Sequence, residues 1–275
     1  MIMFRTSEGR SNYHGAILSV NKRFSHGLQL SANYTFSKSL DQRFGYGQYD
    51  YSLAPNSYDL DAGYGPSFSD HPHVLSGLWL YELPFGRSRR FLNHGGWMDK
   101  LAGGWYLSGI VRSYSGDSMG VYFSPQAFGG GEWAYAVGAV PLTKPRFDND
   151  VHRTSGSGGV GSGADPAAGG TGLNRFADPE AMFKSFRPIR LAADGRGGSG
   201  VLRGYVSWNL DLGAGKMTHL SEKVQFGLTF EFMNVLNQMI FGGPSLDLND
   251  PAQFGVLGWQ MNSPRRIQVG ARVEW

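Results

Sequence analysis

The sequence predicts an all-β protein: an antiparallel transmembrane β-barrel segment of about seven strands, with long extracellular loops and short periplasmic turns. Three observations predict this fold class. Apolar and polar residues alternate over stretches as long as ten residues, and the connections between these stretches alternate between short and long. The composition is also unusual, because Gly accounts for 41 of 275 residues and aromatic residues for 14%. Charged residues make up only 17%, against about 25% in an average protein.

The alternation is strictest over residues 28–37, where every even-numbered residue is apolar or aromatic and every odd-numbered residue is polar. The same period of two recurs over residues 206–214, 223–232 and 266–275. This period is typical of a strand whose two faces meet different surroundings. With two noisier segments and a looser one added, we expect strands at 13–24, 28–39, 72–83, 103–115, 203–215, 222–235 and 264–275.

Strand length favours a membrane barrel over a soluble sandwich. Several expected strands reach ten residues or more, whereas strands of globular proteins are most often about 5–6 residues long. A strand that crosses a membrane needs about 9–11 residues. Aromatic residues toward the strand ends fit the two interfacial girdles of such a barrel. They are Phe24, Tyr34, Phe36, Trp79, Tyr81, Trp105, Phe230, Phe232 and Trp275.

The connections follow the parity of an outer-membrane barrel, which has short periplasmic turns and longer extracellular loops. Three connections are long, at 40–71, 116–202 and 236–263, and they alternate with shorter ones at 25–27, 84–102 and 216–221. We expect a short helix near 97–101 in the intermediate 84–102 connection. We expect one domain over 1–275 with no plug domain. Its 116–202 loop is expected to be partly disordered, because residues 155–172 are mostly Gly, Ser and Ala and such stretches are mobile.

Composition excludes several other classes. There is no Cys, so Cys-ligated zinc, disulfide scaffolds and thiol catalysis are excluded. No run of 18 apolar residues exists, so no transmembrane helix is predicted. The net charge is +3, and the densest basic group is Arg87, Arg89 and Arg90 in an expected turn. We therefore expect no nucleic-acid partner, and we expect no cofactor.

Several motifs along the chain resemble the late barrel strands of TonB-dependent receptors, most closely the Oar-like group that carries a carboxypeptidase-regulatory-like N-terminal domain. The motifs are SNYHG at 11–15, NKRFSHGL at 21–28, NYTFSKS at 33–39, YELPFG at 81–86, RG at 203–204 with NLD at 209–211, FMNVLN at 232–237 with FG at 241–242, and SPRRIQ at 263–268. Their order and spacing are similar to those of the last strands and turns of that group.

The resemblance implies that the chain is the C-terminal part of a receptor barrel in the bacterial outer membrane. Its implied function is TonB-dependent uptake of a substrate such as an iron chelate or a glycan, with no enzymatic activity. The implied partners are outer-membrane lipid, the missing N-terminal barrel strands and plug of the same receptor, the TonB complex through that missing part, and the barrel-assembly machinery. Trp275, an aromatic residue that ends the last strand, resembles the signal which that machinery recognises.

Two groups of residues are candidates for a functional site. The expected extracellular loop at 40–71 combines Tyr with Asp, which can bind a sugar or a cation or can pack the loop on itself. The candidate ligand-binding residues there are Tyr46, Tyr49, Tyr51, Asp59 and Asp61. Polar residues that alternate with the apolar rows are expected to face the lumen, toward a plug, a permeation path or simply water. They are Gln29, Asn33, Gln225, Glu231, Arg266, Gln268 and Arg272.

Two further motifs leave alternatives open. Residues 116–120 match G-x-S-x-G, so one alternative is a lipase-like barrel enzyme with Ser118 as its nucleophile, although that motif requires a helix after the serine. Residues 70–73, Asp-His-Pro-His, contain potential metal ligands, but we interpret them as the entry from a loop into a strand. A soluble secreted β-sheet binding module is another alternative, and the long apolar rows argue against it.

Overall fold

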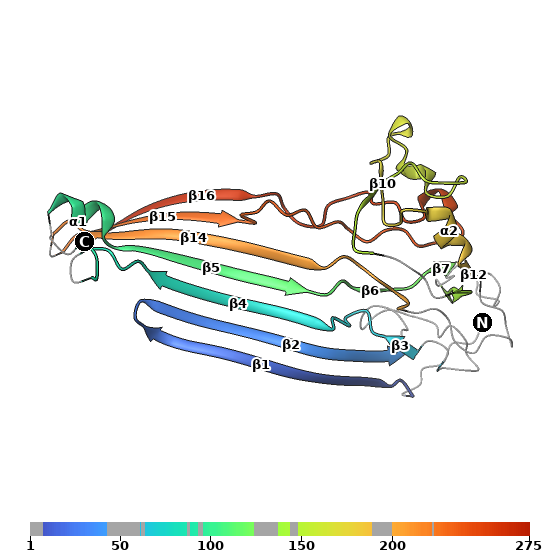
Figure 1. The fold of residues 1–275 in the computed structure, drawn as a ribbon, viewed down its shortest axis with the longest axis horizontal. Helices are drawn as coiled ribbons and strands as arrows, with labels where there is room; N and C mark the ends of the chain where they lie inside the picture. Colours follow the sequence, from blue (N-terminus) through green and yellow to red (C-terminus); the bar gives the residue numbers. More distant parts are fainter. Residues whose placement is uncertain are drawn as a thin grey trace.

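The computed structural model of the chain describes residues 8–42, 61, 64–86, 89–92, 96–123, 137–143, 148–188, 200–221 and 223–275. Seven long strands form one antiparallel sheet in chain order (Figure 1). They are β1 (Ser11–Ser25), β2 (Leu28–Gln42), β4 (His73–Glu82), β5 (Trp105–Tyr114), β14 (Ser207–His219), β15 (Gln225–Met233) and β16 (Arg266–Glu274). The short β3 (Tyr64–Pro66) pairs with the end of β2. The predicted fold class and all seven strands are therefore confirmed.

One strand lies four residues later than predicted, because β14 spans Ser207–His219 rather than 203–215. Its expected first residue is used elsewhere: Arg203 forms β13 (Leu202–Arg203) together with Leu202, and this strand pairs with β6 (Ser118–Met119). At its other end β14 continues because the Met217 N–H donates to the Gly104 carbonyl oxygen at 3.0 Å. Tertiary hydrogen bonds therefore decide where β14 begins and ends, while the alternation of its side chains between the two faces is as predicted.

The two ends of the sheet differ in their connections. At one end, here called the turn end, lie the β1–β2 turn, the β4–β5 connection and the β14–β15 connection. The β4–β5 connection carries α1 (Trp97–Ala102), which confirms the predicted short helix. At the opposite end, here called the loop end, lie the three long connections. The predicted parity of short and long connections is therefore confirmed.

The β1–β2 turn shows why the sequence folds as a hairpin here. His26 and Gly27 both have positive φ angles, 53° and 76°, as a two-residue type I′ turn requires. Gly27 also approaches β4 closely, because the Glu82 N–H donates to its carbonyl oxygen at 2.7 Å. A Cβ at residue 27 would lie 2.9 Å from the Glu82 carbonyl oxygen, so glycine is required for conformation and for space.

The described parts of the second and third long connections fold together at the loop end. We call the described parts of residues 116–206 and 234–263 the loop unit. Its short ladders join β6 to β13, β7 (Tyr122–Phe123) to β8 (Val137–Gly138), β9 (Val140–Pro141) to β12 (Phe186–Arg187), and β10 (His152–Arg153) to β11 (Leu173–Asn174). Its helices are α2 (Pro179–Lys184) and the 3-10 turns η2 (Ser162–Ala164), η3 (Pro166–Ala168) and η4 (Pro251–Gln253).

The loop unit has its own hydrophobic core. This core joins the 116–206 connection to the last connection, and it consists of Val121, Ala139, Val160, Phe176, Met182, Phe186, Leu202, Leu246 and Phe254. Phe254 packs its ring against Phe176 and Phe183, at centroid distances of 5.7 and 5.2 Å. Two connections that lie far apart in the sequence therefore fold as one packed body.

The Gly-rich stretch 155–172 differs from the mobile segment that its composition predicts. It contains η2 and η3, and it is hydrogen-bonded to the last connection. The Gly161 N–H donates to the Pro251 carbonyl oxygen at 2.8 Å, and the Thr171 hydroxyl donates to the Leu257 carbonyl oxygen at 2.6 Å. Several of its glycines have positive φ angles, so here glycine supplies tight turns in a packed structure.

Candidate functional site

The strand register sorts side chains onto two faces of the sheet, because residues directly opposite each other in an antiparallel pair point to the same side. Glu231 lies opposite Gly213 and Gln268, and Asn33 lies opposite Ser76. Followed across all strands, this register brings together on one face every residue predicted to line the lumen. We call this face the polar face. These residues are Gln29, Asn33, Gln225, Glu231, Arg266, Gln268 and Arg272.

Arg112 and Asp211 are charged residues of the polar face that were not among the predicted candidates. Arg112 lies opposite Ser76 and Asn209, on a strand whose alternation is noisy. Asp211 accepts hydrogen bonds from the Asn209 amide at 2.8 Å and from the Asn234 N–H at 2.7 Å. Asp211 could have been found by its place in the alternation of 206–214, whereas Arg112 becomes assignable only through the register of its neighbours.

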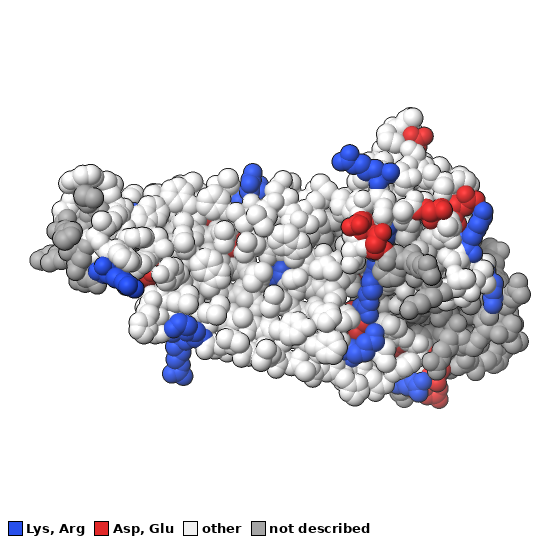
Figure 2. All heavy atoms as spheres, in the orientation of Figure 1, with Lys and Arg blue, Asp and Glu red and all other residues white. Residues whose placement is uncertain are grey.

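The opposite face, which we call the apolar face, carries aliphatic and aromatic rows. Trp208 stands near its loop end, and Trp105 lies opposite Lys216 near its turn end. Eight residues of β14 separate Trp208 from Lys216, which is about 27 Å along the strand at a rise of about 3.4 Å per residue. At a strand tilt of about 35–45°, this corresponds to about 19–22 Å along the membrane normal. The lipid-facing band of an outer-membrane barrel is about 25 Å tall and is flanked by aromatic residues. Figure 2 shows few charged side chains over the strands and a concentration of them at the loop end.

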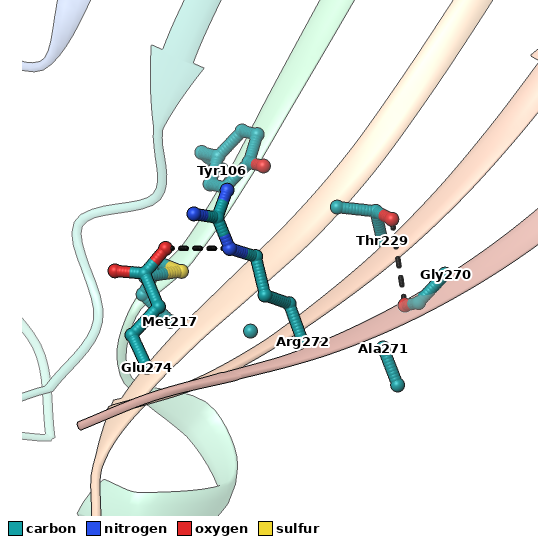
Figure 3. Close-up of a pocket in the computed structure, with 8 residues that line it drawn as sticks. Tyr106, Met217, Thr229, Gly270, Ala271, Arg272 and Glu274 are labelled. Atoms are coloured by element: carbon teal, nitrogen blue, oxygen red, sulfur yellow. Dashed lines mark hydrogen bonds and ion pairs between the residues drawn. The ribbon is translucent and has the colours of Figure 1, made fainter. Parts of the chain in front are cut away.

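A hollow lies on the polar face near the turn end (Figure 3). Its volume is about 370 Å³, and glycines of β15 and β16 leave its floor without side chains. The Tyr106 ring lies over Gly215, where a Cβ would be 2.1 Å from the ring. Arg272 points toward Tyr106 and pairs through Nε with Glu274 at 2.8 Å. Its lining residues are Tyr106, Met217, Gly227, Thr229, Gly270, Ala271, Arg272 and Glu274. The hollow can offer hydrogen bonds to a polar occupant.

A buried carboxylate ties the loop unit to the strands. The Asp70 side chain has no solvent exposure, and it pairs with Arg203 and, at 3.0 Å, with Lys38 of β2. It also accepts a hydrogen bond from the Ser39 N–H at 2.6 Å. Burial raises the pKa of Asp70, but the hydrogen bonds from Arg203, Ser39 and Lys38 outweigh burial and hold the pKa below its usual value. Asp70 is therefore ionised at neutral pH and fixes the loop end of β2 to β13.

The polar network around Asp70 and Arg203 continues into the loop unit through Arg175, which is 1% exposed. Its guanidinium donates to the Arg203 carbonyl oxygen at 3.2 Å and lies 4.4 Å from the centre of the Tyr205 ring. The Tyr205 hydroxyl donates to the Asp150 carbonyl oxygen at 3.3 Å. Burial raises the pKa of Tyr205, although the nearby Arg175 opposes this shift. This polar network therefore connects β2, β13 and the rest of the loop unit.

The histidines beside Asp70 have separate neighbours. His71 Nδ1 lies 2.7 Å from the Ser115 carbonyl oxygen, and His73 Nδ1 lies 2.7 Å from the Tyr34 hydroxyl. No group of three potential metal ligands occurs among the residues that the structure describes. Residues 70–73 lead into β4, which begins at His73, in agreement with our interpretation of them as a strand entry.

Only one of the candidate ligand-binding residues can be placed. Tyr46, Tyr49, Tyr51 and Asp59 lie outside the described residues. Asp61 pairs with Arg10 at 2.9 Å and accepts a hydrogen bond from the Gln42 amide at 2.9 Å. Asp61 therefore contacts the loop end of the first two strands, and its role toward a ligand stays a prediction.

Ser118 lies in β6 and is 2% exposed. Its hydroxyl donates to the Pro66 carbonyl oxygen at 3.4 Å, and the next element along the chain is the strand β7 rather than a helix. The surroundings of Ser118 therefore differ from the strand–turn–helix arrangement of a nucleophile elbow. Trp275 follows β16 and is 92% exposed.

Comparison with known proteins identifies the family. A model of the outer membrane beta barrel domain family matches residues 1–268, and the chain belongs to this family. It is a protein of the bacterial outer membrane, as the sequence predicted. A search of curated proteins and a search of solved structures each gave no match. None of the helices in the described part of the chain is long and apolar enough to cross a membrane.

Proposed function

We propose that this chain is the C-terminal part of the barrel wall of a TonB-dependent receptor, which takes up a substrate such as an iron chelate or a glycan. One observation carries the proposal: the motifs that resemble the late strands of these receptors follow one another in order along the sheet. The YELPFG motif at 81–86 leaves β4 at the turn end, and SPRRIQ at 263–268 enters β16.

The edges of the sheet support the need for further strands. Strands β1 and β16 form its two edges, and no pairing joins them within the described part of the chain. Unpaired backbone groups are not tolerated in lipid, so a barrel wall must close. In the proposed receptor the N-terminal strands of the same polypeptide supply the closure, to a barrel of about 22 strands with a plug in its lumen.

The proposed division of labour follows from the two ends of the sheet. Short turns of outer-membrane barrels are periplasmic, so the loop unit is extracellular and would take part in substrate binding. The polar face would line the lumen beside the plug, which the TonB complex displaces. Trp275 would serve the barrel-assembly machinery, and lipid would cover the apolar face. The proposal assigns no catalytic step to this chain.

The size of the native polypeptide tests the first part of this proposal. Antibodies against the loop unit, used on purified outer membranes of the source bacterium, should detect a polypeptide much larger than the 30.1 kDa of this chain. A single outer-membrane species of 30 kDa would contradict the receptor assignment.

Genetic epistasis tests the transport part. Cells that lack this chain and cells that lack the energising TonB partner should lose uptake of the same iron chelate or glycan, when such nutrients are supplied one at a time. The double mutant should be no worse than either single mutant. Uptake that needs this chain but not TonB would contradict the coupling.

A further inference from the structure

The helix α1 lies on the lipid-facing side of the sheet. The Trp105 indole N–H donates to the Leu101 carbonyl oxygen at 2.9 Å, and the Lys216 ammonium donates to the same oxygen at 3.0 Å. Trp105 and Lys216 are opposite each other on the apolar face. Side chains of that face therefore hold the last turn of α1, which places this turn outside the lumen.

The backbone after α1 fixes this position. Gly104 has a φ of 74°, and a Cβ there would lie 2.1 Å from the Met217 carbonyl oxygen. The Met217 N–H donates to the Gly104 carbonyl oxygen at 3.0 Å. This close approach joins the end of the β4–β5 connection directly to β14, so α1 is tied to the barrel wall at both Lys216 and Met217.

Two large apolar side chains of α1 are exposed. Trp97 is 71% exposed and Leu101 is 63% exposed. The two residues are four positions apart and therefore lie on the same side of the helix. A tight turn would suffice to connect two antiparallel neighbours, yet this connection is long enough to present two large apolar side chains next to the aromatic level of Trp105.

We propose that α1 is an interfacial anchor, and that Trp97 and Leu101 insert into the phospholipid leaflet at the turn end of the barrel. The exposed side of α1 is continuous with the apolar face through Trp105 and Lys216. Trp side chains favour the level of the lipid headgroups. Lys216 carries its ammonium from the apolar face toward the turn end, 5.4 Å from the centre of the Trp105 ring, as interfacial lysines do.

This inference needs only the outer-membrane barrel and does not rest on the receptor assignment. It also gives a reason for the one connection at the turn end that is longer than a turn. A helix in this position would resist sliding of the barrel along the membrane normal, because motion one way would take apolar side chains into water and motion the other way would take the Lys216 ammonium into the hydrocarbon.

The absence of cysteine from the sequence allows a direct test. A nitroxide label is attached to the full chain at L101C, and W97C serves as a second site on the same side of α1. The closed barrel that contains this chain is then reconstituted in vesicles of phosphatidylethanolamine and phosphatidylglycerol. Collisions of the label with oxygen and with a water-soluble nickel complex report its depth. We expect both labels about 5–10 Å inside the headgroup boundary, the depth of an interfacial helix.

Two reference sites calibrate the depth of the labels on α1. L212C marks the middle of the apolar face, and K223C marks the exposed β14–β15 connection at the same end of the sheet. Lipid contact at 97, 101 and 212 with water contact at 223 supports the anchor. Water contact at 97 and 101 with lipid contact at 212 overturns it. Water contact at 212 as well overturns it too, because the apolar face would then not lie in the bilayer.

Discussion

The sheet and the loop unit bury apolar surface in opposite ways. Every buried apolar side chain among the described residues lies outside the seven long strands, in the loop unit. The strands instead expose large apolar side chains, such as Leu18 at 64% and Val269 at 60%. The loop unit is therefore built for water, with a core of its own, whereas the sheet is built for a solvent that is itself apolar.

The difference teaches where stability resides in each region. Backbone hydrogen bonds between neighbouring strands hold the sheet, and we expect its apolar face to gain its stabilisation from lipid. The loop unit relies on packed side chains such as Phe254, which has no solvent exposure. Substitutions in the two regions should therefore act through different mechanisms and should be separable by experiment.

The largest expected effect is in the core of the loop unit. Phe254→Ala should destabilise this unit by about 3–5 kcal/mol, the usual cost of removing a buried Phe side chain. Hydrogen exchange should show lost protection over β10, β11 and α2, with unchanged protection in β14 and β15. Equal loss in both regions would mean that the sheet depends on the loop unit, against the separation described above.

The next effect is on the apolar face and should depend on depth. Leu212 lies four residues from the level of Trp208 and four from Lys216, opposite Gly109 and Phe232. Leu212→Arg should cost about 2–4 kcal/mol, as expected for a charge at the middle of the bilayer. Unfolding of the closed barrel that contains this chain, in lipid vesicles, measures this cost.

Two control substitutions sharpen the depth argument. Leu228→Arg should cost less than Leu212→Arg, because Leu228 lies opposite Lys216 at the turn-end level. Glu231 lies at nearly the same depth as Leu212 but on the polar face. Glu231→Arg should therefore have the smallest cost in stability of the three substitutions. If Glu231→Arg were as costly as Leu212→Arg, the assignment of the two faces would be wrong.

A smaller effect is expected where the two regions meet. Asp70→Ala should cost about 2–3 kcal/mol, below the usual range for a broken buried pair, because Lys38 and Arg203 keep contact with solvent. The folded pKa of Asp70 lies below its usual value of 3.8. Its contribution is therefore fully present above that value and is lost as the pH falls through the folded pKa.

Limited proteolysis of the loop unit between pH 7 and pH 2 checks this prediction. The wild type should become cleavable only at the acidic end, and D70A should be cleaved throughout the range. H71A serves as the control because it keeps the carboxylate. An unchanged acid transition in D70A would show that another group controls the attachment.

The smallest effect is expected at the β1–β2 turn. Gly27→Ala should cost about 1–2 kcal/mol, because a residue with a Cβ is strained in the left-handed region, and the added Cβ would press on the Glu82 carbonyl oxygen. His26→Gly is the matched control and should leave stability nearly unchanged. Denaturant titration of both variants separates the two expectations.

The sequence was a good guide to the sheet and a poor guide to the loop unit. The period of two in residues 28–37 and 223–232 marks each strand and its facing directly, because every second side chain meets the same surroundings. Residues 155–172 carry no such signal, and their composition indicates mobility. Their fold depends on Pro251–Gln253 and on Leu257, which lie in another connection.

The sequence by itself determined the seven strands to within a few residues, the facing of the strictly alternating ones, and the alternation of short and long connections. These features follow from local periodicity and from the spacing of the segments that carry it. Only the tertiary structure decided that the loops share a core, that Asp70 pairs with Arg203, and that α1 lies on the apolar face. Those features join residues distant along the chain, and such contacts depend on how the elements meet in space rather than on any pattern within one segment.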